Sequence, residues 1–471
     1  MVFSSSIFLL LFLPLFLVVY QVTPKSYKNY IILFASLIFY SWGAPKFLFV
    51  LLITSTIDFY LIKQLYLSNT EKQKKHILLL SLALNLGLLA YFKYANFFVD
   101  NFNEALSYLG FENIKWLSVI LPIGISFFTF QSISYSVDVY RKTHPPLLKL
   151  TDYLLFIFSF PQMIAGPIVR FSFIANQIYN RVETYEDKLI GFYRFSIGLA
   201  KKVLIANILG EQADIILNGN ISEINFITAW IGILAYTFQI YFDFSGYSDM
   251  AIGLGRMMGF SFPENFNSPY TAKCITDFWK RWHISLGDFM RDYVYIPLGG
   301  NRLGKSRTYF NLIVIFLLSG FWHGASYNFI LWGTYHGFFM ILDRLFLEKL
   351  LRKSGALFSN SFTFFIIVLG WIIFRIEQLS AIEAYLIKLF SIDLTILSQN
   401  NFLIIMILIA GIFSFATNFE VGKRLNQFFY CENDYTKKQH LLLSIFSLTL
   451  FTLSLSAITS SNFNPFIYFK F

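Results

Sequence analysis

The feature that most constrains this chain is a series of long apolar runs that recur from one end to the other. Residues 4–22 form the first of these runs and contain no charged side chain. A helix needs about 20 apolar residues to cross the hydrocarbon core of a bilayer. Hydrophobic residues are 56% of the chain and charged residues only 14%, whereas a soluble domain carries about 25% charge. The sequence therefore predicts an all-α polytopic membrane protein of about 11–13 transmembrane helices, with re-entrant and interfacial helices among them.

Positive charge is concentrated in a few loops, which gives the chain an orientation. The formal net charge of +10 would suggest nucleic acid in a soluble domain. Here Lys and Arg gather between apolar runs, as they do in cytoplasmic loops, while the acidic stretch 97–115 falls on the other side. This alternation predicts that both termini lie outside, that the first run is a retained span rather than a signal peptide, and that nucleic acid is not a partner. The basic loops are 25–28, 70–76, 141–149 and 423–438.

Two regions depart from simple spans. Two prolines and a glycine interrupt the apolar stretch Leu154–Val169. Such broken backbone is tolerated at membrane depth only where protein or a wet cavity surrounds it, so we expect a re-entrant hairpin there. Charges also cluster over Lys273–Arg307, which predicts short helices along the cytoplasmic face. The rest reads as one integral membrane domain over 1–471, ending in an outer tail at 461–471.

Among the six histidines, His323 is the leading candidate for chemistry. No charged residue lies between Arg307 and Asp343, so His323 is expected at membrane depth, where an ionisable side chain is costly. Gly320 and Gly324 beside it allow another backbone to approach closely. The pattern fits a functional histidine or a core histidine that is hydrogen-bonded to a neighbouring helix, and the residues alone leave both open.

His336 and His283 are the two other histidines that stand away from the basic loops. If one continuous helix carried both His323 and His336, about 100° per residue would place them on nearly opposite faces, so a structural role is predicted for His336. His283 lies in the segment Asp277–Arg302, where aromatic and basic side chains interleave. From the residues alone an interfacial belt is the favoured interpretation, and the wall of a polar funnel for an anionic substrate is the alternative.

Two carboxylates, Asp243 and Asp249, stand in the otherwise apolar segment Gln239–Met250. They could relay protons or pair with arginines such as Arg256 or Arg170. Pairing is the favoured interpretation, because a buried charge is rarely left alone.

Several familiar motifs are excluded by their spacing. The glycines of residues 253–259 lack the spacing of a dinucleotide fingerprint, and HExxH, GxSxG and CxxC do not occur. Cys274 and Cys431 are far apart and have no metal-ligand spacing around them, so neither a disulfide framework nor a metal site is predicted.

Five sequence blocks between residues 121 and 337 carry a more specific signal. Together and in this order they resemble the membrane-bound O-acyltransferase family, and within it the bacterial branch that contains the alginate O-acetylation protein and the peptidoglycan O-acetyltransferase. The blocks are LPIGISFFTFQSISYSVDVYR (121–141), FPQMIAGPIVR (160–170), QIYFDFSGYSDMAIGLGRMMGF (239–260), DFWKRWHISLGDFMRDYVYIPLGGNR (277–302) and GFWHGASYNFILWGTYHG (320–337).

The resemblance implies a fold and an activity. The fold is a ring of helices around a thinned centre, where a cytoplasmic funnel meets an outer one. The histidine of the WHG block, His323, is implied to be catalytic, and His283 is implied to be the second polar position of the site. The activity is transfer of acetyl from cytoplasmic acetyl-CoA across the bacterial inner membrane to an extracytoplasmic glycan. Peptidoglycan is the first expectation, alginate or another exopolysaccharide is the alternative, and a periplasmic SGNH-type transferase is the expected partner.

The donor side can be argued from charge. A basic cytoplasmic face suits the phosphates of acetyl-CoA, which is expected as a substrate rather than as a bound cofactor. At the bottom of the funnel, a buried imidazole stays neutral and can serve as general base for an attacking hydroxyl. The cations proposed for the phosphates are Lys280, Arg281, Arg291 and Arg302.

The chain ends in PFIYFKF, which resembles a C-terminal motif of some of these acyltransferases and of the small membrane partner in the D-alanylation system. In that motif the tyrosine is thought to carry the acyl group, which here implies Tyr468. An aromatic interfacial anchor is the alternative. For the whole chain, a flippase of an acylated carrier and a scaffold for a periplasmic transferase remain the non-enzymatic alternatives.

Overall fold

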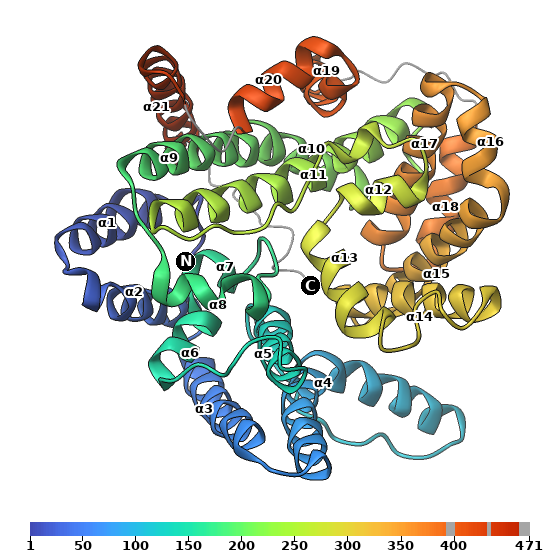
Figure 1. The fold of residues 1–471 in the computed structure, drawn as a ribbon. Coiled ribbons are helices and arrows are strands. Elements are labelled where there is room, and N and C mark those ends of the chain that lie inside the picture. Colours follow the sequence, from blue (N-terminus) through green and yellow to red (C-terminus); the bar gives the residue numbers. More distant parts are fainter. Residues whose placement is uncertain (392–400, 431–434, 461–471) are drawn as a thin grey trace. The chain divides into compact units, whose positions relative to one another are not determined.

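The computed structural model describes residues 1–391, 401–430 and 435–460, and over these ranges the ordered elements are helices (Figure 1). Within them a single isolated bridge, between Phe266 and Trp282, is the one β-type pairing. The all-α prediction is therefore confirmed. The chain forms two compact units: unit 1 comprises residues 1–2, 7–182 and 260–262, and unit 2 comprises residues 3–6, 183–259 and 263 onward.

Unit 1 contains eight α-helices. They are α1 (Leu13–Val22), α2 (Lys28–Gly43), α3 (Pro45–Leu67), α4 (Glu71–Tyr108), α5 (Ile125–Tyr140), α6 (Leu150–Phe158), α7 (Phe160–Met163) and α8 (Phe171–Asn180). Of these, α2 to α5 are the long ones and α6 to α8 are short.

Unit 2 contains the remaining described helices, and a six-residue π-helical turn, η3 (Lys201–Ala206), directly follows the first of them. The helices are α9 (Tyr185–Ala200), α10 (Asn207–Leu217), α11 (Phe226–Met257), α12 (Ile275–Arg281), α13 (Ile284–Met290), α14 (Lys305–His323), α15 (Tyr327–Leu342), α16 (Glu348–Lys353), α17 (Ala356–Arg375), α18 (Leu379–Phe390), α19 (Asn401–Phe415), α20 (Glu420–Tyr430) and α21 (Lys437–Ser460).

Five helical segments in the described residues are long and apolar enough to cross a membrane: α3, α4, α17, α21 and Asn401–Asn418, which includes α19. They leave many large apolar side chains exposed, such as Leu79 and Leu80 of α4, which suits a surface that faces lipid. Other long helices, such as α11, carry buried charged residues, so length and hydropathy alone do not identify them as membrane-spanning. The predicted membrane protein is therefore confirmed.

Helix α4 is longer than the sequence suggested. It has 38 residues, which corresponds to roughly 57 Å, almost twice the hydrocarbon thickness. The acidic stretch from residue 97, expected as an outer loop, therefore continues the helix as far as Tyr108. Asn103 closes the return, since its Oδ1 accepts a hydrogen bond from the backbone N–H of Ile114 at 2.7 Å.

The predicted interruption of the apolar stretch from Leu154 is present, since α6 and α7 replace a single span. Freed backbone groups at the break find partners: the N–H of Phe160 donates to Ser36 Oγ at 3.0 Å, and Gln162 donates to the carbonyl of Phe156 at 2.6 Å. The broken backbone is thus buried in protein, which is the condition for its survival at membrane depth.

Unit 1 also buries a carboxylate on a spanning helix. Asp58 of α3 is fully buried, and it accepts hydrogen bonds from Ser81, from Tyr153 at 2.7 Å and from Asn85 at 3.1 Å. These donors come from α4 and α6, so the carboxylate ties three helices together and its cost of burial is offset by three hydrogen bonds.

In unit 2, α9 and α11 lie side by side (Figure 1) and approach each other through glycines. A Cβ on Gly198 would lie 2.5 Å from the carbonyl oxygen of Gly246, and one on Gly253 would lie 2.5 Å from that of Gly191. Small residues let two membrane helices pack backbone against backbone. This close crossing places the cations of α9 and η3 directly against the carboxylates of α11.

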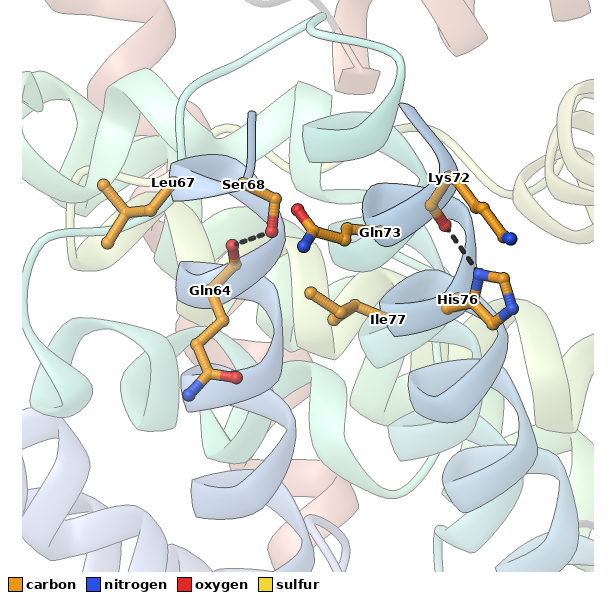
Figure 2. A pocket seen from close by; sticks show the side chains of 7 residues that line it. All are labelled: Gln64, Leu67, Ser68, Lys72, Gln73, His76 and Ile77. Atoms are coloured by element: carbon orange, nitrogen blue, oxygen red, sulfur yellow. Dashed lines mark hydrogen bonds between the residues drawn. The ribbon is translucent and has the colours of Figure 1, made fainter. Parts of the chain in front are cut away.

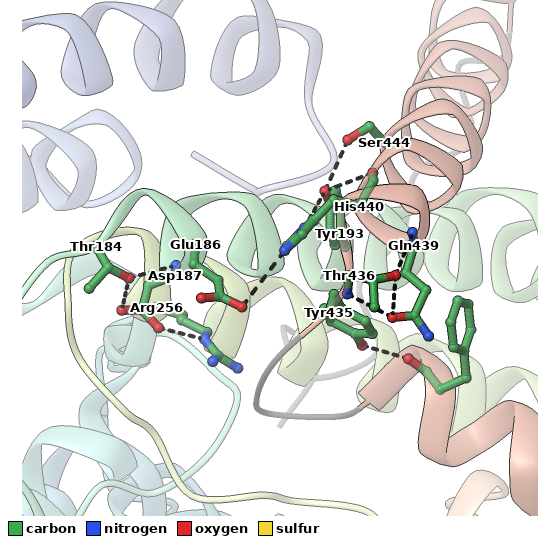
Figure 3. Close-up of polar contacts among 11 residues, drawn as sticks. Thr184, Glu186, Asp187, Tyr193, Arg256, Tyr435, Thr436, Gln439, His440 and Ser444 are labelled. Carbon is green, nitrogen blue, oxygen red and sulfur yellow. Dashed lines mark hydrogen bonds and ion pairs between the residues drawn. The ribbon is translucent and has the colours of Figure 1, made fainter.

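The N-terminal end of α21 is hydrogen-bonded to α9, as Figure 3 shows. The hydroxyl of Tyr193 donates to the backbone carbonyl of His440 at 3.1 Å and lies 2.9 Å from Ser444 Oγ. Nε2 of His440 lies 3.7 Å from a carboxylate oxygen of Glu186. His440 is therefore part of the contact between α9 and α21.

Candidate active site

His323 is the last residue of α14, and the helix stops there because Gly324 is extended, with φ −172° and ψ 155°. The side chain is 5% exposed. Aromatic rings enclose it on several sides, with centroid distances of 4.8 Å to Trp322, 5.2 Å to Trp332 and 5.0 Å to Phe374. The predicted burial of His323 in apolar surroundings is therefore correct.

The expected close approach beside His323 also occurs. A Cβ on Gly320 would lie 2.2 Å from the carbonyl oxygen of Phe329, and one on Gly333 would lie 2.3 Å from that of Phe316. Helices α14 and α15 thus cross in backbone contact. The crossing holds His323 against the start of α15.

His283 occupies the junction between α12 and α13, and its backbone is left-handed with φ 48°. It is 2% exposed, which does not fit the exposed aromatic belt favoured from the residues. Its ring packs edge-on against Phe244 at 4.7 Å. Nδ1 lies 3.0 Å from Oδ1 of Asn265. Burial lowers the pKa of His283 to about 3, so the imidazole is neutral near pH 7.

The structure brings His283 and His323 together through one indole. The ring of Trp322 lies 4.8 Å from that of His323 and 6.0 Å from that of His283. These two histidines, distant in sequence, therefore share one aromatic environment. The catalytic roles that the resemblance implied for these two histidines stay predictions.

His336 has a different place. The assumption that one helix carries His323 and His336 is wrong, because α14 ends at His323 and α15 begins at Tyr327. The indole of Trp332 lies against both imidazoles, 5.2 Å from His323 and 4.9 Å from His336. His336 also packs on Trp279 at 5.0 Å and is 1% exposed, so a packing role follows.

A polar cavity of about 330 Å³ adjoins His283, and Asn265 and Ile284 are among its lining residues. Asp249 lies on its wall, where it pairs with Arg194 at 2.7 Å and with Lys201 at 2.6 Å. Arg194 also pairs with Glu264 at 2.6 Å. The wall is thus polar but carries balanced charge.

A second cavity, of about 340 Å³, shares Asn267 and Asn426 with the first. Its lining includes three cations, Lys273, Arg281 and Lys423. Arg281 is paired with Asp277, and Lys423 with Glu420, and the remaining lining side chains are uncharged. The two cavities are therefore neighbours: the second carries three cations, and the first, beside the partner of His283, carries balanced charge.

The four cations proposed for the donor phosphates are not gathered in one place. Arg281 lines the second cavity. Arg291 is 54% exposed and pairs with Asp288 and Asp292. Lys280 and Arg302 are exposed. The short helices predicted for this region are present as α12 and α13, and they scatter the cations over several faces.

The sequence interpretation of the α11 carboxylates was right about pairing and wrong about partners. Asp249 pairs with Arg194 and Lys201, and Asp243 pairs with Lys202 at 2.6 Å. The partner expected for one of them, Arg256, pairs instead with Asp187 at 3.1 Å (Figure 3). The glycines of α9 and α11 were the available signal, because their matching spacing fixes which residues face each other.

The two cysteines, Tyr468 and a third cavity do not contribute to the described site. Cys274 is a buried thiol whose Sγ accepts the N–H of Asp277 at 3.4 Å, whereas Cys431 and Tyr468 lie outside the described residues. A third cavity, shown in Figure 2, is a surface depression at the α3–α4 turn. There Ser68 and His76 hydrogen-bond the carbonyls of Gln64 and Lys72 in their own helices, so they do not converge on a ligand position.

Comparison with known proteins identifies the family. The profile described as "MBOAT, membrane-bound O-acyltransferase family" matches residues 37–382. A probable alginate O-acetylase, AlgI, of Pseudomonas putida is 39% identical over the full length of both chains. A peptidoglycan O-acetyltransferase of Helicobacter pylori is 37% identical over 81% of this chain and 78% of its own. A teichoic acid D-alanyltransferase of Bacillus subtilis is 32% identical over 52% of this chain and 64% of its own. The chain thus belongs to the membrane-bound O-acyltransferase family and is an acyltransferase.

Proposed function

We propose that this enzyme transfers acetyl from cytoplasmic acetyl-CoA, across the bacterial inner membrane, for O-acetylation of an extracytoplasmic glycan. The observation that carries the proposal is the buried pair His283 and His323, which share Trp322. The hydrogen-bond partner of His283, Asn265, lines a polar cavity. The names of the full-length relative and the Helicobacter relative, an O-acetylase and an O-acetyltransferase, support acetyl as the group transferred.

His323 is proposed as the general base. A neutral imidazole takes the proton of an attacking hydroxyl while the hydroxyl oxygen bonds to the thioester carbonyl carbon. The carbon–sulfur bond then breaks, and the CoA thiolate takes up a proton to leave as the free thiol.

For the donor, the two neighbouring cavities differ in charge in a way that suits the two parts of acetyl-CoA. Phosphates suit the basic end, where Lys273, Arg281 and Lys423 gather. The neutral pantetheine arm, with its amides, suits the polar end beside Asn265. Lys280, Arg291 and Arg302 lie on exposed surfaces and are proposed to attract the polyanion at longer range.

The acceptor is proposed from the relatives and from topology. Peptidoglycan is the first candidate, in line with the Helicobacter relative. Alginate or another exopolysaccharide is the second, because the Pseudomonas relative matches over the full length of both chains. With both termini outside, as the basic loops indicate, Tyr468 is proposed to hold the acetyl as an ester, from which a periplasmic SGNH-type transferase passes it to the glycan.

The test replaces the gene in its own host by a His323→Ala variant and measures ester-linked acetyl separately in peptidoglycan and in exported polysaccharide. The account expects acetyl to disappear from one of the two fractions with membrane levels of protein unchanged. The matched control is His76→Gln, since His76 is exposed and hydrogen-bonded within its own helix. Unchanged acetyl in both fractions contradicts the proposal, and the fraction that changes names the acceptor.

A further inference from the structure

The side chain of Asn265, in the loop between α11 and α12, makes several hydrogen bonds around the candidate site. It is fully buried. Its Oδ1 accepts from Ser285 Oγ at 2.8 Å and from the Ser285 backbone N–H at 3.4 Å, and it lies 3.0 Å from Nδ1 of His283. Its Nδ2 donates to Ser248 Oγ at 3.0 Å. One side chain thus joins α11 to the start of α13 and to the candidate site.

These contacts fix the orientation of the amide. A backbone N–H can only donate, so the Asn265 atom that faces the Ser285 N–H is the carbonyl oxygen. The same oxygen faces Nδ1 of His283, and an oxygen acceptor requires a hydrogen on that nitrogen. The neutral imidazole therefore carries its proton on Nδ1 and its lone pair on Nε2.

That lone pair has no partner in the part of the chain that the structure describes. Nε2 of His283 is buried, and no hydrogen-bond donor of those residues reaches it. Buried acceptors are normally satisfied, so an exception calls for a reason such as a catalytic role. The rings of Phe244 and Trp322 pack on this imidazole, and neither donates a hydrogen bond to Nε2.

The backbone conformation of His283 also supports a functional role. Its φ of 48° is a left-handed conformation that a residue with a Cβ rarely adopts. Asn265 holds it there, because the carbonyl of Asn265 accepts the N–H of Ile284 at 3.0 Å. Unusual backbone conformations that the surroundings enforce are concentrated at functional sites.

We propose that Asn265 is a positioning residue, which fixes the Nδ1–H tautomer of His283 so that Nε2 accepts a hydrogen bond from a substrate. The substrate group is an N–H or O–H donor: an amide of the pantetheine arm or the reacting hydroxyl. Asn265 acts through His283, because both ends of its amide are already engaged by Ser285, His283 and Ser248. The inference rests on the proposed function only in that it needs an acyl-transfer assay.

The experiment uses the full-length protein in proteoliposomes, with acetyl-CoA as donor, and compares Asn265→Ala with Asn265→Asp. Alanine removes the acceptor for Nδ1–H, so activity should fall on the order of 10²-fold. Aspartate keeps an acceptor oxygen, so activity should recover most of the way. Ser285→Ala is the control, because it removes a neighbouring hydrogen bond onto Asn265 and leaves the contact with His283.

A double variant separates positioning from general stability. With His283→Ala already present, Asn265→Ala should cause no further loss of activity. Equal damage by Ala and Asp at position 265, or an additive loss in the double variant, overturns the inference. A raised apparent KM for acetyl-CoA in Asn265→Ala assigns the pantetheine amide as the donor to Nε2, and a lowered kcat assigns the reacting hydroxyl.

The outcome is distinguishable from failure of the proposed function. Loss of transfer in His323→Ala together with full activity in Asn265→Ala overturns the role of Asn265 and leaves the function standing. Full transfer in His323→Ala overturns the proposed function whatever the Asn265 variants do. Melting temperatures in detergent, measured for all variants, confirm that the activities compare folded proteins.

Discussion

His283 and His323 both lie near one indole, because Trp322 packs against both imidazoles, at centroid distances of 6.0 and 4.8 Å. One histidine terminates a long helix, and the other sits in a left-handed turn between two short helices. The indole of Trp322 therefore supplies apolar surface between the two histidines of the candidate site.

The cations of the second cavity should control use of the donor. In the triple variant Lys273→Ala, Arg281→Ala, Lys423→Ala, the apparent KM for acetyl-CoA should rise about 10-fold or more with kcat little changed, because phosphate contacts bind rather than catalyse. Initial rates in proteoliposomes measure this. The control is Arg352→Ala, which removes an exposed charge paired with Glu348. An unchanged KM places the phosphates elsewhere.

Gly198 should not tolerate a side chain. A Cβ there would lie 2.5 Å from the Gly246 carbonyl oxygen and 2.7 Å from the Met250 nitrogen, so Gly198→Val forces α9 and α11 apart, at a cost of about 1–3 kcal/mol or more. Thermal unfolding in detergent should show a lower Tm. Gly87→Val is the matched control, since nothing lies within 4 Å of its Cβ position in α4. Equal Tm values for the two variants would contradict the close crossing.

Several features of the fold and of the candidate site could be predicted from the sequence. The helical fold, the burial of His323 and the interruption after Phe158 all follow from local patterns: long apolar runs, a charge-free stretch around one histidine, and prolines within a span. The pairing of Asp249 also followed, because a buried charge is usually paired. The family resemblance, carried by five blocks, agreed with the comparisons.

Long-range packing accounts for what the sequence did not show. The partners of Asp249 depend on how α9 lies on α11, and on the π-helical turn η3, which brings successive lysines, Lys201 and Lys202, to carboxylates on α11. The burial of His283 depends on α11, α13 and Trp322 meeting around it. Aromatic and basic residues interleave in sequence equally well at a surface belt and at a buried turn, so local pattern could not decide.

Stability should depend on pH through His283, which lies outside the helices long enough to span a membrane. Burial lowers its pKa from 6.5 to about 3, so between these values the unfolded chain binds a proton that the folded chain does not. Stability should therefore fall as the pH drops below about 6.5. Melting temperatures should show a weaker acid dependence in His283→Gln than in the wild type. The exposed-site control His76→Gln should keep the wild-type slope, and identical slopes in all three proteins would contradict the burial.

Tyr468 should behave as a carrier rather than an anchor. Tyr468→Phe keeps the ring and its interfacial preference but removes the hydroxyl, so glycan acetylation should stop as completely as in His323→Ala. Mass spectrometry of the wild type should find acetyl on the C-terminal peptide and none on that peptide in either variant. Normal glycan acetylation in Tyr468→Phe would leave an anchor and require direct transfer from the donor.

The central claim is that His323 performs the acyl transfer, and the most direct measurement is transfer of radiolabelled acetyl from acetyl-CoA by purified protein in proteoliposomes. A positioned general base contributes roughly 10²- to 10⁴-fold in rate. The account predicts a loss of that size in His323→Ala and in His323→Gln, with melting temperatures near that of the wild type. The His76→Gln control should keep wild-type activity. Transfer by His323→Ala within a few-fold of the wild-type rate would contradict the account.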